Sequence, residues 1–499
     1  MVIHGSVARN GFSALKGDIT SWNVKYSIYT GEGESQPAVG DANGDGTPDV
    51  IFVNYSSCAV KSYNGASGTL QWSVSFGSGG SASAPSMGDV RPDVAGLEIA
   101  VTCGNGTLYL LRGTDGSLLW SRGGRGGYPA PVIVADGPDT LILSATGSTL
   151  YATDPYGTLR WSAPVGGTNY HSATPAVGDI DGDGSMEVVV RGSDGYVRAY
   201  NLSDGSTLWT RYLGSTSVWS EVSLGDVTGD CEDEVIVGIE RTLYVLNGND
   251  GSTYWSYSMG GYVAGPISVA DVNGDSLRDI IVGIRNSPSY CVHGGGIVTL
   301  SATGSPIWQN TGWTPNAMHG GGRVIADFDN DGDLEVAGVP YGSWCNGDGT
   351  FRMINASTGV TEWTYSTGVD AEGSSMADVD GDMCAELMLL PSCCDNYSII
   401  VLDGPATGCG FYPYNDTCGV LGGDRDLGTE ESEEGVRVSI TGGPGGITVR
   451  TEGEVPIRLY STDGRLVFKG SVSGAGRIPL RPGTYFAVLR GKVYRVVVR

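Results

Sequence analysis

The sequence predicts an all-β protein in which an eight-bladed β-propeller is followed by a small C-terminal immunoglobulin-like β-sandwich. Glycine makes up 81 of the 499 residues and only 17% are charged, which excludes a coiled coil or a helix bundle. An acidic, glycine-containing segment recurs eight times at intervals of 43 to 56 residues, beginning at Asp41, Asp89, Asp136, Asp179, Asp226, Asp271, Asp327 and Asp378. Repeats of this length that contain four short strands are typical of propeller blades.

The pattern inside each repeat predicts a four-stranded antiparallel meander. A β-branched run follows the acidic segment, and then come a turn, a second strand, an Asp-Gly or Thr-Gly turn and a tryptophan, as in residues 187–209. The segments are short, alternate with a period near two and are separated by glycine turns. Seven copies end in a tryptophan that we expect to pack between blades: Trp72, Trp120, Trp161, Trp209, Trp255, Trp308 and Trp363.

The eighth copy, which begins at Asp378, has no tryptophan of its own, whereas Trp22 precedes the first acidic segment. We therefore expect a strand near Trp22, within residues 21–28, to be the outermost strand of the last blade. Such a strand closes the ring and covers two sheet edges. The alternative is a seven-bladed ring in which the copy near Asp136 is absorbed into a neighbour.

Six acidic segments have an oxygen-bearing side chain at positions 1, 3, 5 and 9. Alternate spacing turns these oxygens inward, and a glycine at position 4 or 6 permits the tight bend. Hard oxygen ligands favour Ca²⁺ over zinc or copper, and the β-run after position 9 distinguishes these loops from EF-hands. The sequence predicts up to about six structural calcium sites, formed by Asp41, Asn43, Asp45 and Asp49; Asp179, Asp181, Asp183 and Glu187; Asp226, Thr228, Asp230 and Glu234; Asp271, Asn273, Asp275 and Asp279; Asp327, Asp329, Asp331 and Glu335; and Asp378, Asp380, Asp382 and Glu386.

The alternative for each loop is an Asx turn without a metal, because Asp, Asn and Gly are common in hairpins for their own reasons. Two copies lack the ligand set. Arg91 replaces the third ligand after Asp89, and the segment after Asp136 is shortened to residues 137–139. We expect these two blades to hold no metal.

The loop and its flanks, as in residues 175–187, resemble the FG-GAP or VCBS repeats of integrin-α-like propellers. The second half of each unit, as in residues 243–255, resembles the quinoprotein-type eight-bladed propeller repeat. Together the two resemblances cover about residues 20–405. They imply a propeller with structural calcium in its loops. They leave function open, because such propellers occur in adhesion proteins, polysaccharide lyases and assembly factors.

Charge and cysteine content narrow the class of protein further. The net charge of −26 argues against sequence-independent binding to nucleic acid or to an anionic membrane. No apolar run is long enough to span a membrane, and residues 1–25 lack the pattern of a signal peptide, so we expect a processed form or an unorthodox export route. Ten cysteines without a CxxC motif favour disulfides and an extracytoplasmic compartment: Cys58, Cys103, Cys231, Cys291, Cys345, Cys384, Cys393, Cys394, Cys409 and Cys418.

The adjacent pair Cys393 and Cys394 resembles the disulfide beside the quinone in some quinoprotein dehydrogenases. Its position argues for a different role, because it falls in a turn of the last repeat, near the expected positions of Cys58 and Cys345. We therefore expect disulfides between blades at this rim, and no quinone.

The C-terminal part differs from the rest in charge. We expect the propeller to span residues 1–423, an acidic linker residues 424–435, and the sandwich residues 436–499. Residues 436–499 contain 11 Lys and Arg against 3 Asp and Glu, a net charge of +8, whereas the rest of the chain carries −34.

Three stretches of this module, residues 455–467, 478–486 and 492–499, resemble the type A C-terminal sorting domain of the type IX secretion system. The resemblance implies export across the outer membrane of a Bacteroidetes-like bacterium, with the secretion machinery as a partner. The alternative is an ordinary terminal sandwich module.

Ligand sites in propellers usually lie at the mouth of the central channel, just before the innermost strands. The aromatic candidates there are Tyr128, Tyr170, Trp219 and Tyr262, and the acid–base candidates are Glu221, Glu372, His171 and His319. The alternative is that they only fill the channel rim.

No nucleophile elbow, metalloprotease motif, P-loop or dinucleotide fingerprint occurs in its required context. We expect a secreted, surface-associated calcium-binding propeller that binds a polysaccharide or a protein. The alternative is a secreted polysaccharide-degrading enzyme, a lyase or hydrolase.

Overall fold

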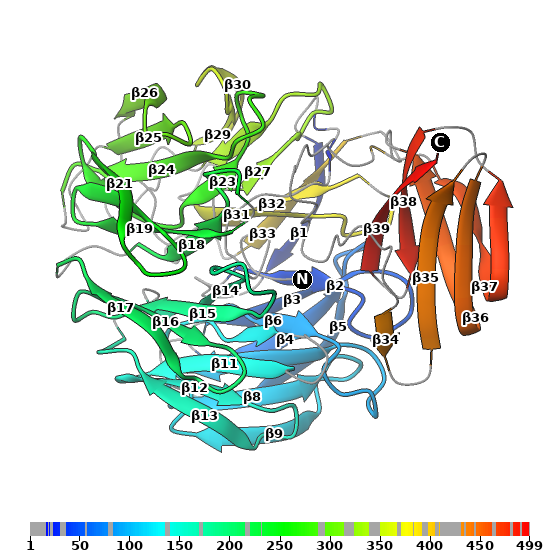
Figure 1. Cartoon of the computed structure of the whole chain (residues 1–499). Coiled ribbons are helices and arrows are strands. Elements are labelled where there is room, and N and C mark those ends of the chain that lie inside the picture. Colours follow the sequence, from blue (N-terminus) through cyan, green and yellow to red (C-terminus); the bar gives the residue numbers. More distant parts are fainter. Residues whose placement is uncertain are drawn as a thin grey trace. The chain divides into compact units, whose positions relative to one another are not determined.

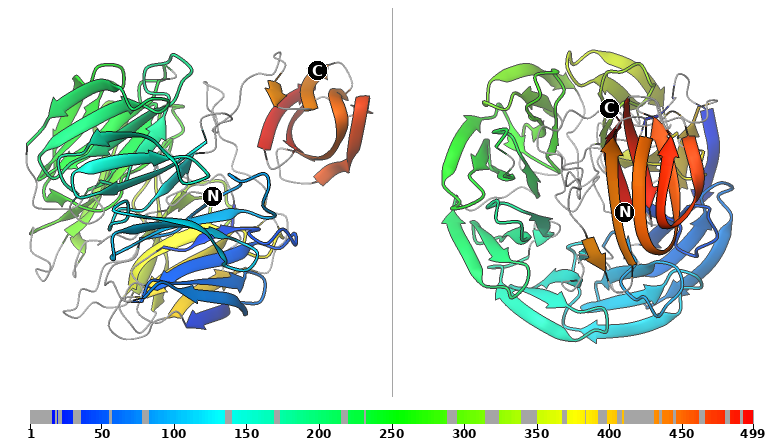
Figure 2. Two further views of the ribbon diagram at one scale, coloured as in Figure 1. Left: turned by 90° about the horizontal axis from the view of Figure 1, so that it is seen from below. Right: turned by 45° about the vertical axis from the view of Figure 1, so that its right-hand side comes forward.

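Each repeat forms one antiparallel sheet in the computed structural model, and the eight sheets of residues 23–403 confirm the eight-bladed propeller (Figure 1). The sheets follow one another around a ring (Figure 2, right). The structure describes residues 16–17, 19, 23–29, 36–54, 57–77, 83–134, 140–168, 173–214, 220–230, 232–287, 295–313, 324–338, 350–366, 371–382, 384–391, 398–404, 409, 431–433, 436–443, 446–461, 466–479, 483–489 and 492–498.

The first four blades run in chain order from the innermost to the outermost strand. Their strands are β2 (Ala38–Gly40), β3 (Asp49–Asn54), β4 (Ala59–Asn64) and β5 (Leu70–Ser75); β6 (Ser86–Gly88), β7 (Glu98–Cys103), β8 (Thr107–Arg112) and β9 (Leu118–Gly123); β10 (Val132–Val134), β11 (Leu141–Thr146), β12 (Thr149–Thr153) and β13 (Leu159–Pro164); and β14 (Ala176–Gly178), β15 (Glu187–Arg191), β16 (Tyr196–Asn201) and β17 (Thr207–Tyr212). The copy near Asp136 thus forms its own third blade, and the seven-bladed alternative is wrong.

The last four blades follow the same order, apart from an extra short strand in the sixth and a strand from the N-terminal part in the eighth. Their strands are β18 (Val222–Gly225), β19 (Glu234–Ile239), β20 (Thr242–Leu246) and β21 (Thr253–Ser258); β22 (Tyr262–Val263), β23 (Ser268–Ala270), β24 (Asp279–Arg285), β25 (Gly295–Leu300) and β26 (Pro306–Trp313); β27 (Val324–Ala326), β28 (Glu335–Gly338), β29 (Thr350–Asn355) and β30 (Thr361–Ser366); and β31 (Ala371–Ala377), β32 (Glu386–Pro391), β33 (Ser398–Asp403) and β1 (Asn23–Tyr29).

The apolar core lies between neighbouring blades. The second strand of a blade is buried on both faces, as in β15, where all residues are buried. Leu143 and Trp161 of the third blade form one cluster with Val188 and Tyr200 of the fourth. A strand covered on both sides requires a continuous β-branched run, and this is the pattern found after each acidic segment.

A tryptophan in the outermost strand connects each of the first six blades to the next. Its indole Nε1 donates a hydrogen bond of 2.5 to 2.9 Å to a backbone carbonyl that follows the third strand of the next blade: Trp72 to Gly113, Trp120 to Pro155, Trp161 to Leu202, Trp209 to Gly248, Trp255 to Ala302 and Trp308 to Ala356. The ring lies against a turn glycine with positive φ. At Gly205 (φ 71°), for example, a Cβ atom would lie 2.6 Å from the ring of Trp161.

The N-terminal strand closes the ring. β1 pairs with β33 and is therefore the outermost strand of the eighth blade. Tyr26 contacts the first blade: its hydroxyl donates a hydrogen bond to the carbonyl of Gly65, and its ring lies against Gly68. Trp22 itself lies outside the described residues.

The chain divides into two compact units, one with most of residues 17–405 and one with residues 406–499 and the short stretches 14–16 and 382–384. The second unit contains β34 (Glu431–Glu433), β35 (Val436–Gly443), β36 (Gly446–Ser461), β37 (Leu466–Pro479), β38 (Gly483–Leu489) and β39 (Lys492–Val498). These strands form one six-stranded antiparallel sheet, which does not confirm a two-sheet sandwich. β34 also lies in the stretch predicted to be a linker.

Two disulfides occur among the described residues. Cys58, in the turn before β4, pairs with Cys103 at the end of β7, so this bridge joins the first two blades as expected for the rim. Cys384 pairs with Cys409. Cys393 and Cys394 lie outside the described residues.

In the described part of the chain, no helix has the length and hydropathy needed to cross a membrane.

Candidate metal centres

The acidic segments lie between the first and second strands of their blades. In each of the six predicted metal loops, position 9 is the first residue of the second strand, as predicted: Asp49, Glu187, Glu234, Asp279, Glu335 and Glu386. Glu98 takes the same place in the second blade. Each of these carboxylates therefore lies at the base of its loop.

One oxygen of the position 9 carboxylate supports the loop backbone. Oε2 of Glu187 accepts a hydrogen bond from the backbone N–H of Ile180 at 3.2 Å, and that of Glu386 accepts one from Val379 at 2.6 Å. Glu98 accepts two such bonds, from Val90 and Arg91. Because the second-blade loop, which lacks the predicted ligand set, keeps this bond, the bond itself is structural.

The position 1 carboxylate shapes the bend. The two oxygens of Asp179 accept hydrogen bonds from the backbone N–H groups of Gly182 at 2.9 Å and Gly184 at 3.0 Å. Asx-type turns are therefore present. The predicted alternative was an Asx turn without a metal. To decide between the two, we ask whether the remaining carboxylate oxygens have hydrogen-bond partners within the chain.

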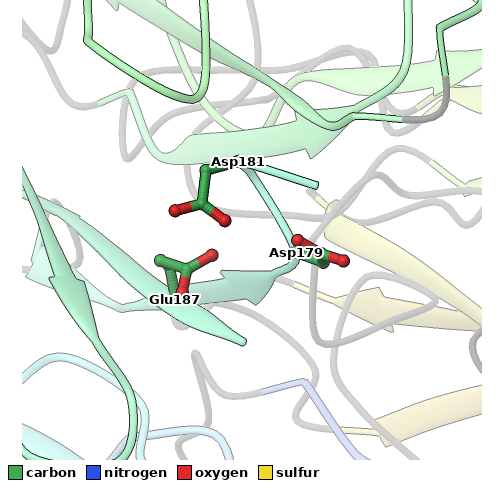
Figure 3. A group of neighbouring side chains, drawn as sticks. All are labelled: Asp179, Asp181 and Glu187. Carbon is green, nitrogen blue, oxygen red and sulfur yellow. The ribbon is translucent and has the colours of Figure 1, made fainter. Parts of the chain in front are cut away.

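Three loops bring carboxylates together. In each, one oxygen from each of three side chains lies within 4.8 Å of the others: Asp179, Asp181 and Glu187 in the fourth blade, Asp327, Asp329 and Glu335 in the seventh, and Asp378, Asp380 and Glu386 in the eighth. Figure 3 shows the first of these clusters gathered at the start of β15. Oxygen atoms at this spacing, on side chains that are all acidic, could hold a hard divalent cation.

The glutamate of each cluster has one oxygen that its surroundings leave unsatisfied. Oε1 of Glu187, Glu335 and Glu386 is buried and has no hydrogen-bond partner. The same holds for Oε1 of Glu98 in the second blade, so it is the three gathered carboxylates, which the described residues do not show at Glu98, that distinguish the three loops. Burial, together with neighbouring carboxylates, raises the pKa of Glu187 to about 7, that of Glu386 to about 9 and that of Glu335 to about 10. A buried polar atom without a partner is costly, and a bound cation would remove the cost.

The first and sixth loops differ, because an amide at position 3 donates to the position 9 carboxylate. Oδ1 of Asp49 accepts hydrogen bonds from Gln71 Nε2 at 2.8 Å and from Asn43 Nδ2 at 3.4 Å. Oδ1 of Asp279 accepts one from Asn273 Nδ2 at 3.1 Å. The two oxygens that would face a metal are therefore satisfied by the chain.

The fifth loop resembles these two, with a hydroxyl in place of the amide. Thr228 Oγ1 lies 3.5 Å from Oε1 of Glu234. The sequence contained a signal that separates the loops with gathered carboxylates from the others. Position 3 is Asp in the three convergent loops and Asn or Thr in the other three. The prediction treated all oxygen-bearing side chains as equal and did not include this difference.

The second and third blades were expected to hold no metal. In the second, Arg91 occupies position 3 and forms two hydrogen bonds to Asp93, at 2.8 and 2.7 Å. Its guanidinium also lies 4.3 Å from the ring centroid of Tyr156 in the next blade. The shortened segment at Asp136 lies outside the described residues.

The predicted ligand and acid–base residues at the channel mouth are only partly described. Tyr128 is half-buried, Glu221 is buried just before β18, and Tyr262 in β22 lies under the guanidinium of Arg241, 4.5 Å from the ring centroid. Glu372 is described only as a backbone position in β31. Tyr170, His171, Trp219 and His319 lie outside the described residues, so a catalytic group at this position stays a prediction.

Solved structures show that the fold is shared with proteins of different roles. BamB from Moraxella catarrhalis superposes with a TM-score of 0.52 at 15% identity, covering 77% of this chain and 98% of that chain. Quinohemoprotein alcohol dehydrogenase from Comamonas testosteroni has a TM-score of 0.58 at 12% identity, covering 81% of each chain. The V. cholerae biofilm matrix protein Bap1 has a TM-score of 0.56 at 14% identity, covering 78% of this chain and 93% of that chain.

No curated protein matches this sequence. The family model described as outer membrane protein assembly factor BamB matches residues 44–192 and 193–385, which is more than half of the chain. This match agrees with the quinoprotein-type repeat noted in the second half of each blade, and with the eight sheets of the ring. The chain belongs to the family of the outer membrane protein assembly factor BamB.

Proposed function

We propose that this protein is a calcium-stabilised propeller that serves as a secreted, cell-surface-associated binding scaffold. The observation that carries the proposal is the pair of clusters in the fourth and seventh blades, each with a buried, unpaired glutamate oxygen facing two aspartates. Asp179, Asp181 and Glu187 would hold one Ca²⁺, and the cluster at Asp327, Asp329 and Glu335 a second. The bound ion would neutralise carboxylates that otherwise repel one another inside a loop.

Calcium binding is tested by titration of the full-length, disulfide-intact protein. We expect two ions per chain, and one ion after Asp181→Asn. The matched control is Asp275→Asn at position 5 of the sixth-blade loop, where Asn273 already satisfies Asp279. That variant should leave the number of ions unchanged. A protein that binds no calcium, or an Asp181→Asn variant that still binds two ions, would contradict the proposal.

The partner we propose is an extracellular polysaccharide or a surface protein. Membership in the BamB family supports a scaffold role, and the strongly acidic propeller argues against nucleic acid. The test is incubation with a panel of bacterial and plant polysaccharides, with calcium or with EGTA, followed by mass spectrometry. Retention of intact polymer supports the scaffold. New oligosaccharides would show that the polymer is cleaved, would favour the enzyme hypothesis over the scaffold, and would direct mutagenesis to Glu221.

We also propose that the convergent loops are FG-GAP or VCBS-like and that residues 436–499 direct export by a type IX system. The sequence stretches at residues 455–467 and 478–486 support the second point. A reporter protein carrying residues 424–499 should reach the surface of a bacterium that has this secretion system. Retention of the reporter in the periplasm would contradict this assignment.

A further inference from the structure

The outermost strand of every blade contains a β-bulge at the same place. In each case the pairing with the third strand skips one residue, and the next residue is the tryptophan or, in β1, Tyr26. A bulge changes the direction in which a side chain points. The skipped residues are Lys25, Gln71, Leu119, Arg160, Leu208, Tyr254, Ile307 and Glu362.

In two blades the bulged side chain contacts the acidic loop of its own blade among the described residues. Gln71 donates to Asp49 at 2.8 Å in the first blade. In the eighth, Lys25 Nζ lies 2.7 Å from Asp380 Oδ2. The bulge therefore brings an amide to one loop and an ammonium to another.

Lys25 is an internal cation at the point where the ring closes. Its ammonium pairs with Asp380 at 2.7 Å and with Asp403, at the end of β33, at 2.6 Å. The three side chains are only 17 to 19% exposed. Burial alone would lower the pKa of Lys25, but the hydrogen bonds to Asp380 and Asp403 outweigh it and hold the group charged. The cluster of the eighth blade thus already contains a positive charge.

We propose that the bulged Lys25 supplies the cation of the eighth blade's acidic loop, where its ammonium takes the place that calcium would have. The comparison with the calcium-binding loops rests on the proposed function. The role of Lys25 has its own geometry, in ion pairs of 2.7 Å to Asp380 and 2.6 Å to Asp403.

The physical basis is that a tethered ammonium competes with a free ion at a high effective concentration. Lys25 is held by β1, whose pairing with β33 keeps the ammonium beside both aspartates. A divalent ion would have to displace it from Asp380, and the half-buried ammonium would then be paired with Asp403 alone and would lie next to a doubly charged ion, which is unfavourable. The closing strand is thereby held to the eighth blade without calcium, while the fourth and seventh blades need the ion.

The first experiment counts calcium ions bound by full-length Lys25 variants in equilibrium dialysis. Lys25→Leu gives the eighth blade the apolar bulged residue that the fourth blade has in Leu208, and we expect one ion more than in the unchanged protein. Lys25→Arg keeps the positive charge and should add none. Lys25→Gln copies Gln71 of the first blade and should add none either. A folded Lys25→Leu protein with no additional ion would overturn the assignment.

A second variant keeps the test decisive if Lys25→Leu does not fold. Asp380→Asn should leave the number of ions unchanged, because the ammonium holds that place. The loss of one ion would show that calcium binds beside Lys25, and so overturn the proposal. If the unchanged protein binds no calcium but Lys25→Leu binds one ion, then the proposed function fails and the role of Lys25 stands. If neither the unchanged protein nor Lys25→Leu binds calcium, both the proposed function and the role of Lys25 fail.

Discussion

The hydroxyl of Tyr26 donates a hydrogen bond to the backbone carbonyl of Gly65, and this contact joins the eighth blade to the first. It repeats the geometry of the indole contacts around the ring, with a phenol in place of an indole. The ring is therefore closed by the same kind of contact that joins each of the first six blades to the next, although the strand that provides it comes from the opposite end of the propeller sequence.

Removal of this hydroxyl should destabilise the closure. Tyr26→Phe leaves the Gly65 carbonyl without its donor, and we expect a loss of about 1 to 3 kcal/mol in the free energy of unfolding. The measurement is denaturant unfolding of the full-length protein. Tyr212→Phe, at a tyrosine that is 58% exposed, is the control and should change the stability by less than about 0.5 kcal/mol. Equal effects of the two substitutions would contradict a specific role of the closing contact.

A side chain at the turn glycines should disturb the contact between blades. In Gly205→Ala, the new Cβ would meet the ring of Trp161 at 2.6 Å, and φ of 71° is itself unfavourable for alanine. We expect a loss of about 2 kcal/mol or more in thermal or denaturant unfolding. Gly123→Ala is the matched control, because no atom lies within 4 Å of its added Cβ. A Gly205→Ala protein as stable as Gly123→Ala would show that the ring can move away without cost.

Calcium removal should lower the melting temperature of the propeller. An ion that binds only the folded state stabilises it by mass action, by about 2.7 kcal/mol at a hundredfold excess over Kd. EGTA should therefore lower the melting temperature, and added calcium should restore it. The shift should be smaller in Asp181→Asn, which has lost one ion, and unchanged in the control Asp275→Asn. No shift in the unchanged protein would count against bound calcium.

The second-blade loop should make stability depend on pH without a metal. Burial raises the pKa of Glu98 to about 7 from its ordinary 4.5, despite the hydrogen bonds from Val90 and Arg91. Between these two values the folded state binds more protons than the unfolded state, so stability falls as the pH rises from about 4.5 to 7. The loss should be on the order of 1 to 3 kcal/mol.

Glu98→Gln should remove this part of the pH dependence. The substitution keeps an oxygen that can accept the bonds from Val90 and Arg91, but it cannot ionise. Melting curves of both proteins between pH 5 and 8, recorded with EGTA present, should differ in slope. Parallel curves would show that Glu98 ionises freely in the folded protein.

The number of blades and the place of the acidic loops could be predicted from sequence, because both depend on local patterns. The repeat length, the alternation within each strand and the turn glycines act over a few residues, and they placed Glu187 and Glu335 at the start of their strands. The contact of Tyr26 with the first blade was not predicted. The pairing of β1 with β33 decides which aromatic ring reaches the first blade, and that pairing joins distant parts of the chain.

The sequence by itself determined the propeller, its strand order and the residues that could bind metal. Position 3 separates the loop of Glu187, which keeps a buried oxygen without a partner, from the loop in which Asn273 satisfies Asp279. Only the tertiary structure decided which side chains from other strands reach the loops. Lys25 and Asp403 are 378 residues apart and meet only because the ring closes. Local propensity depends on neighbouring residues, but the balance of charge in a buried loop depends on every strand that the fold brings to it.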